Sequence, residues 1–121
     1  MWPFKKKKKY SDDAIKENGK AIIEMSQLIS IAIVGVENPE LKKRLKRIQD
    51  QVKYLNPTVD SRALAIDKKI LDQIKDMRVE VSKPNNEVME EKIEMKIRSI
   101  ELLIPERIAY SKTYAGVKDD L

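Results

Sequence analysis

The sequence lacks several residue types on which common functional sites depend. It contains no cysteine and no histidine, and only three glycines and five prolines among 121 residues. Without cysteine the chain forms no disulfide, and without both residues it has no Cys/His zinc site. The commonest general base of enzymes is absent as well, as is any glycine-rich phosphate-binding loop. We therefore predict a non-enzymatic protein with no cofactor, no metal and no small-molecule substrate.

Carboxylates alone do not change this prediction. Glu87 and Glu91, like Glu90 and Glu94, are four residues apart, a spacing that helical bundles use for metal ligands. Di-metal bundles add a Glu-x-x-His motif on the inner face, which this chain cannot supply. These glutamates also fall outside the isoleucine pattern of their segment, so we expect no metal there.

The excess positive charge is concentrated in the first ten residues. The formal net charge is +5, and this segment holds five lysines and no acid, which leaves 20 basic and 20 acidic residues in the rest of the chain. The same segment holds Trp2 and Phe4, the only tryptophan and the only phenylalanine. A balanced body argues against a general phosphate-binding protein and indicates a local role for the basic segment.

We predict that this segment contacts an anionic membrane surface. Tryptophan favours the headgroup region, and lysines are attracted to anionic lipid. The contact residues would be Trp2, Phe4, Lys5, Lys6, Lys7, Lys8 and Lys9. Two other interpretations stay open: a solvated tail whose aromatic residues fold back on the body, and a nucleic-acid or protein partner.

No segment has the pattern of a signal peptide or a membrane span. The apolar start precedes the lysines, the reverse of a secretory signal. The most apolar window, residues 21–36, contains Glu24 and is shorter than the roughly 20 residues of a spanning helix. We expect a cytoplasmic protein that touches the membrane from that side.

A long apolar helix over residues 14–36 is the element that the rest of the chain must cover. Apolar residues recur every seven positions, with a second seam between them: Ile15, Ile22, Ile29 and Val36, then Met25 and Ala32. Ser11 is the expected N-cap, and Asn18-Gly19 is a weak point that could form a turn. A buried strand over residues 28–36 is the alternative, although no second strand is available to pair with it.

Three further helices follow at short intervals. The second has Asn38 as N-cap, Pro39 as first residue and the seam Leu41, Leu45, Ile48, Val52 and Leu55. The third starts near Thr58 or Asp60, with Ala63, Ile66, Ile70, Ile74, Met77 and Val81 inside and Asp67 on its outer face. The fourth opens at Glu87, has the stripe Met89, Ile93, Ile97, Ile100, Ile104 and Ile108, and ends at about residues 114–116.

These patterns predict an all-α antiparallel four-helix bundle whose last helix is kinked at Pro105. The bundle domain would span residues 11–116, between a basic and aromatic tail at residues 1–10 and a C-terminal tail at residues 117–121. Tyr110 and Tyr114 share a face and are expected to cover the end of the last helix. We expect the bundle to act as an interaction or scaffold protein that associates with itself or with a protein partner.

The second helix carries a basic cluster that is a candidate anion or partner surface: Lys42, Lys43, Arg44, Lys46 and Arg47. With the lysine tail it could bind phosphate backbones, which makes a nucleic-acid-binding protein the rival prediction. No recognition-helix motif or aromatic stacking platform accompanies the cluster. A solvated face, or pairing with the acidic stretch at residues 87–101, is the other interpretation.

Overall fold

A computed structural model describes the backbone of residues 2–120 and the side chains of residues 13–111. It contains α1 (Trp2–Gly35), α2 (Pro39–Lys53), α3 (Ser61–Val81) and α4 (Glu87–Asp120), and this described part of the chain has no strand. The helical bundle is confirmed, and the first and last helices are the long ones, as expected. The alternative of a strand over residues 28–36 is wrong, because α1 continues through them to Gly35.

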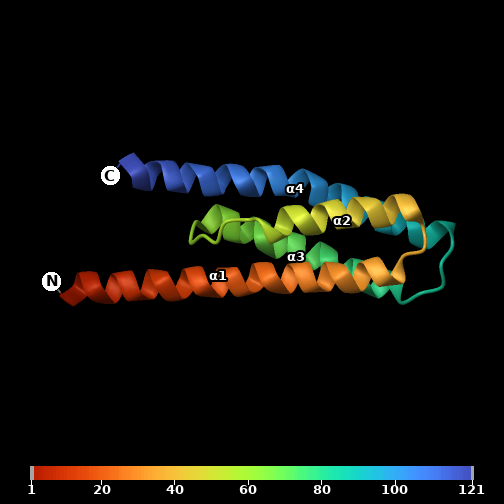
Figure 1. Ribbon diagram of the computed structural model, residues 1–121, viewed down its shortest axis with the longest axis horizontal. Helices are drawn as coiled ribbons and strands as arrows, with labels where there is room; N and C mark the ends of the chain where they lie inside the picture. Colours follow the sequence, from red (N-terminus) through yellow and green to blue (C-terminus); the bar gives the residue numbers. More distant parts are fainter. Residues whose placement is uncertain (1, 121) are drawn as a thin grey trace.

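Each helix packs against two others (Figure 1). Helix α1 contacts α2 and α3, and α4 contacts the same two helices. Among the described residues, no Cα atoms within 8 Å join α1 to α4 or α2 to α3, so these pairs lie diagonally across the bundle. The segment between α2 and α3 therefore crosses from one corner of the bundle to the opposite one. The predicted antiparallel packing fits these connections and, like the kink at Pro105, stays a prediction.

Side-chain caps define the starts of the three later helices. Asn38 Oδ1 accepts hydrogen bonds from the amides of Glu40 and Leu41, at 2.9 and 3.3 Å. The Asp60 carboxylate is the N-cap of α3, and Asn86 Oδ1 accepts from the amide of Met89 at 2.9 Å. Such caps satisfy amide groups that have no partner inside the helix. The predicted start of α2 at Asn38-Pro39 is confirmed, as is Asp60 at the start of α3.

Both long helices extend beyond the ends predicted for them. Helix α1 begins at Trp2, so Ser11 lies inside it and is not its N-cap, and Asn18-Gly19 forms no turn. Lysine is a good helix former, and proline is tolerated in a first turn, so the segment with Pro3 and five lysines can be helical. Helix α4 continues through Pro105 and past residues 114–116 to Asp120. The predicted boundaries of these two helices, at residue 11 for the first and residue 116 for the last, were therefore wrong.

The core follows the predicted seams except at one end. Its largest fully buried side chains include Ile29 of α1, Leu45 of α2, Ile70 of α3 and Ile97 of α4. Ile15, however, is only half-buried, and Ile108 is 37% exposed. Asp67, predicted on the outer face of α3, is only 5% exposed. Polar side chains take the inward positions at this end, as described below.

None of the helices, over the described residues, contains a stretch long and apolar enough to cross a membrane.

Candidate interaction surface

The basic cluster of α2 does not form one surface, because Arg44 is held within the bundle. Its Nη2 lies 2.6 Å from Oε1 of Glu101 on α4, and its Nε donates to Oε2 of the same carboxylate at 3.3 Å. Glu94 Oε1 lies 3.5 Å from Nη1. The hydrogen bond with Glu101 is the main reason that the pKa of Arg44 is raised. The predicted pairing of α2 with the acidic stretch of α4 is thus confirmed at this residue.

Three lysines of α2 lie instead along the flank that is next to α1. Lys42, Lys46 and Lys53 form a series with Gln49 at intervals of four, three and four residues, which is one side of an α-helix. Gln49 identifies that side, because its Nε2 donates to the carbonyl of Ser26 on α1 at 2.9 Å. Nε2 of Gln49 also contacts the hydroxyl of Ser30. Lys43 and Arg47 are exposed and lie outside this series.

The side of α1 that faces away from the core carries both lysines and exposed apolar residues. Lys16, Lys20, Ile23 and Val34 follow one another at intervals of four, three and eleven residues, again one side of a helix. Ile23 is 58% exposed and Val34 is 83% exposed. We call the combined surface the α1/α2 face; it consists of Lys16, Lys20, Ile23, Val34, Lys42, Lys46 and Lys53.

A groove of about 520 Å³ lies in this face between α1 and the segment that follows α2. Its charged lining consists of Lys16, Lys20 and Lys53, and among the described residues no acid lines it. Its apolar lining is formed by Ile22, Ile23, Leu55 and Pro57, beside Gly19. Lys20 Nζ lies 3.4 Å from Glu17 Oε1, but both side chains are about three-quarters exposed, so this pair leaves Lys20 available to an anion.

The predicted membrane contacts are joined to this face by one helix. The side chains of Trp2, Phe4 and the lysines at positions 5–9 lie outside the described residues, but their backbone forms the first turns of α1. In the sequence, Lys16 is preceded at intervals of seven, four and three residues by Lys9, Lys5 and Trp2. The backbone of the basic and aromatic segment is therefore a continuation of the helix that bears the groove.

The glutamates at the start of α4 line a different groove. Glu87, Glu90, Glu91 and Glu94 surround about 440 Å³ together with Asn38 and Arg44. Over the described residues, no group of three or more histidine, cysteine, aspartate or glutamate side chains is arranged to hold a metal ion. The cationic and acidic surfaces of the bundle are thus separated, the first on α1 and α2 and the second at the start of α4.

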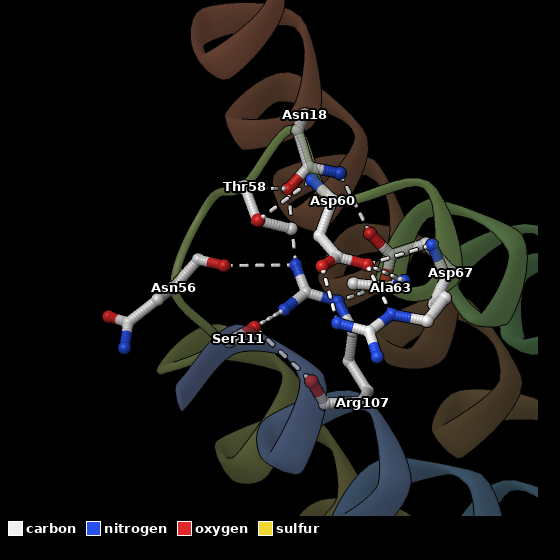
Figure 2. A network of polar contacts seen from close by, with 9 residues as sticks. Asn18, Asn56, Thr58, Asp60, Ala63, Asp67, Arg107 and Ser111 are labelled. Carbon is white, nitrogen blue, oxygen red and sulfur yellow. Dashed lines mark hydrogen bonds and ion pairs between the residues drawn. The ribbon is translucent and has the colours of Figure 1, made fainter. Parts of the chain in front are cut away.

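A buried polar layer, missed by the sequence analysis, closes the core at one end (Figure 2). At its centre lies Arg107 of α4, which is 0% exposed. Its Nε donates to Asp67 Oδ1 of α3 at 2.6 Å, and its Nη2 donates to Asn18 Oδ1 of α1 at 3.1 Å. Its Nη1 also contacts the hydroxyl of Ser111. Nη2 further donates to the carbonyl of Asn56 at 2.9 Å.

The other members of this layer complete the network. Asn18 Nδ2 donates to Asp67 Oδ2 at 2.7 Å, and the Thr58 amide donates to Asn18 Oδ1 at 3.0 Å. Among the described residues no buried side-chain nitrogen or oxygen lacks a partner. A closed and fully satisfied network offers no position to a substrate, and we assign it to holding α1, α3, α4 and the segment between α2 and α3 in register.

The signal that could have found this layer is the spacing of the seams. In α1 the buried series Met25 and Ile22 continues backward by four residues to Asn18, and in α4 Ile104 is followed by Arg107 and Ser111 at intervals of three and four. The predicted seam of α1 passed over Asn18 to Ile15, and the predicted seam of α4 took Ile108 in place of Arg107. Both predicted seams omitted polar residues that occupy buried positions of the helix, and at these positions they are wrong.

Tyr110 covers the end of the core beside this layer. It is partly buried against the core, the Arg62 guanidinium lies 4.6 Å from its ring centroid, and its hydroxyl lies 3.3 Å from Glu106 Oε1. The role of cover predicted for Tyr110 is confirmed, and the side chain of Tyr114 lies outside the described residues.

Comparisons of the chain with protein-family models, with curated proteins and with solved structures found no match.

Proposed function

We propose that this protein is a non-enzymatic helical scaffold that binds peripherally to the anionic, cytoplasmic face of a membrane through the first turns of α1. The observation that carries the proposal is the position of the charge. The formal net charge of +5 equals the charge of the five lysines at positions 5–9, which stand beside the only tryptophan and phenylalanine. A solubility tail needs no aromatic residues, and an arm that packs on the core needs no run of lysines.

The proposed contact combines two weak attractions. Each lysine close to an anionic leaflet contributes about 1 kcal/mol at low screening, and aromatic side chains partition into the headgroup region. Neither attraction anchors a protein by itself, but together they support reversible binding. Because α1 is continuous from Trp2 to Gly35, the contact would also orient the bundle on the membrane.

The bundle itself would present a surface to a protein partner or to a second copy of the chain. Large apolar side chains are exposed on more than one helix, among them Val79 of α3 and Met95 and Leu102 of α4. We expect light scattering to show species larger than a monomer at high concentration, and a strict monomer would remove self-association from the proposal.

Vesicle sedimentation of the full chain tests the membrane contact. Binding should require phosphatidylserine in phosphatidylcholine vesicles and fall with added salt. Replacing the five tail lysines by Gln should weaken binding at least about tenfold, and Trp2→Ala with Phe4→Ala should weaken it as well. A matched control variant also loses five positive charges, but in α3 and α4. It replaces five residues by Gln, namely Lys68, Lys69, Lys75, Arg78 and Lys92, and should bind nearly as the natural chain does.

Two results would contradict the proposal. One is equal sedimentation of the natural chain with and without anionic lipid. The other is binding to DNA or RNA that weakens steeply with salt while vesicles are ignored, which would favour the nucleic-acid-binding alternative.

A further inference from the structure

We infer that the α1/α2 face is a second lipid-binding surface, so that the bundle lies with α1 and α2 along an anionic bilayer and does not stand on the first turns of α1 alone. This inference rests on the proposed membrane binding and adds to it the contact surface and the orientation. The occupant is the anionic leaflet, with a lipid phosphate at the groove lined by Lys16, Lys20 and Lys53.

The arrangement of charge on this face is the first argument. Three ammonium groups from two helices converge on one groove without an acid in its described lining. Lys42 and Lys46 continue the positive charge along the flank of α2 that Gln49 joins to α1. On α1, Glu17 pairs directly with Lys20 at 3.4 Å, with both side chains about three-quarters exposed. Asp12 and Asp13 precede Lys16 by four and three residues in the sequence and are further acids close to the lysine series. A surface of this sign is complementary to anionic headgroups.

The apolar residues between these lysines are the second argument. Ile23 and Val34 are 58% and 83% exposed, although they belong to the same side of α1 as Lys16 and Lys20. The groove is floored by Leu55 and Pro57 beside the lysines. Free phosphate or a nucleic-acid backbone would use the cations only. A lipid offers a phosphate to the ammonium groups and a glycerol and acyl region to the apolar floor, which is the pattern of interfacial helices.

The continuity of α1 is the third argument. A helix of 34 residues is about 51 Å long, because each residue adds about 1.5 Å. The sequence series that runs from Trp2 through Lys5 and Lys9 to Lys16 has the spacing of one helix side. Lipid bound by the tail would therefore bring the groove to the same leaflet.

The first experiment removes the charge of the groove. The variant K16Q/K20Q/K53Q keeps the tail intact, and its three sites are exposed, so the fold should be retained. We expect its affinity for phosphatidylserine-containing vesicles to fall about tenfold or more. The matched control K69Q/K75Q/K92Q removes three exposed lysines of α3 and α4 and should change affinity by less than about twofold.

The second experiment reads the orientation directly. Since the chain has no cysteine, Val34→Cys and Met95→Cys can each carry one environment-sensitive fluorophore. Both positions are more than two-thirds exposed, and Met95 belongs to α4, diagonally across the bundle from α1. On addition of anionic vesicles the emission of the label at position 34 should shift to the blue, whereas that of the label at position 95 should stay unchanged.

The outcomes separate this inference from the membrane tether, by which we mean the proposed contact of the first turns of α1 with anionic lipid. If the groove variant binds as the natural chain does while the tail variant does not, the α1/α2 face is no lipid contact and the tether stands. Equal responses of the two labels would overturn the orientation in the same way. If the groove variant is weakened and the tail variant is not, the face is the lipid contact and the tether is wrong. A natural chain that ignores anionic vesicles would overturn both.

Discussion

Among the individual residues, Arg107 has the largest consequence for the fold. It is a fully buried cation, and removing an ion from water costs several kcal/mol unless its partners compensate. Asp67 supplies the countercharge at 2.6 Å, and Asn18 and the Asn56 carbonyl take up further donors. Arginine suits this position because its planar fork can reach several acceptors at once.

We predict that Arg107→Met lowers the free energy of unfolding by about 3–5 kcal/mol, since it leaves the Asp67 carboxylate buried without its cation. Adding Asp67→Asn removes that charge and leaves an acceptor for Asn18, so the double variant should regain more than about 1 kcal/mol. Urea unfolding followed by far-UV circular dichroism measures both changes. Equal stabilities of the single and double variants would show that the buried charge is not the cause.

Among the elements, α1 joins the core, the polar layer and the α1/α2 face. Its inward side passes from Ile29 and Met25 to the polar Asn18, while its outward side carries Lys16 and Ile23. Two glycines interrupt it, and neither has a positive φ, so neither is required by backbone conformation. Their surroundings differ, which allows opposite effects of the same substitution.

We predict that Gly19→Ala stabilises the protein and Gly35→Ala destabilises it. A Cβ at Gly19 would meet Pro57 Cγ at 3.7 Å, an ordinary contact, so the gain in helix propensity of about 0.5–1 kcal/mol should be realised. A Cβ at Gly35 would lie 2.8 Å from Val81 Cβ, and relieving that overlap should cost about 1–3 kcal/mol. Thermal unfolding of the two variants checks the signs, and an increase in Tm for both would contradict the packing of α1 against Val81.

At the scale of the whole molecule, the polar layer answers a problem created by the topology. The segment between α2 and α3 crosses the diagonal of the bundle and brings backbone groups close to the core. Buried backbone groups need hydrogen-bond partners, which an apolar core cannot provide. Arg107 binds the Asn56 carbonyl and Asn18 binds the Thr58 amide, so the polar layer fastens the crossing segment to α4 and α1.

Acid should weaken the same region. The hydrogen bond from Arg62 is the main reason that the pKa of Asp60 is lowered from 3.8 to about 2. Because the folded-state pKa is depressed, the stabilisation from this carboxylate is complete above about pH 4 and is lost as the pH falls toward 2. Asp60→Asn keeps a capping side chain but has no carboxylate to protonate.

We therefore predict that the Tm difference between the natural chain and Asp60→Asn shrinks as the pH is lowered from about 4 to about 2. Asp72→Asn, at an exposed position of the same helix, is the control and should show little of this trend. A Tm difference for Asp60→Asn that is constant across this range would contradict the coupling of Asp60 to Arg62.

Much of this molecule was determined by the sequence alone, because the forces involved are local. Apolar spacing predicted four helices and most buried residues. The N-cap Asn38, and the start of the third helix near Thr58 or Asp60, were predicted from neighbours only two or three residues away. The polar layer could not be found in that way. Asn18 and Arg107 are 89 residues apart, and Arg107 and Asp67 are 40 apart, so each side chain by itself favours solvent. Only the tertiary structure supplies the partners that make their burial stable.

For the candidate interaction surface, too, part could be predicted from the sequence and part was decided by the tertiary structure. The sequence identified the basic residues of α2 and the lysines near the start of α1, because charge is visible residue by residue. Which of them share a surface was decided by packing: Glu101 holds Arg44 within the bundle, whereas Lys53 and Lys16 line one groove between α1 and the segment that follows α2. A charge is a property of one side chain, but a charged surface depends on which helices lie side by side, and that follows from the fold.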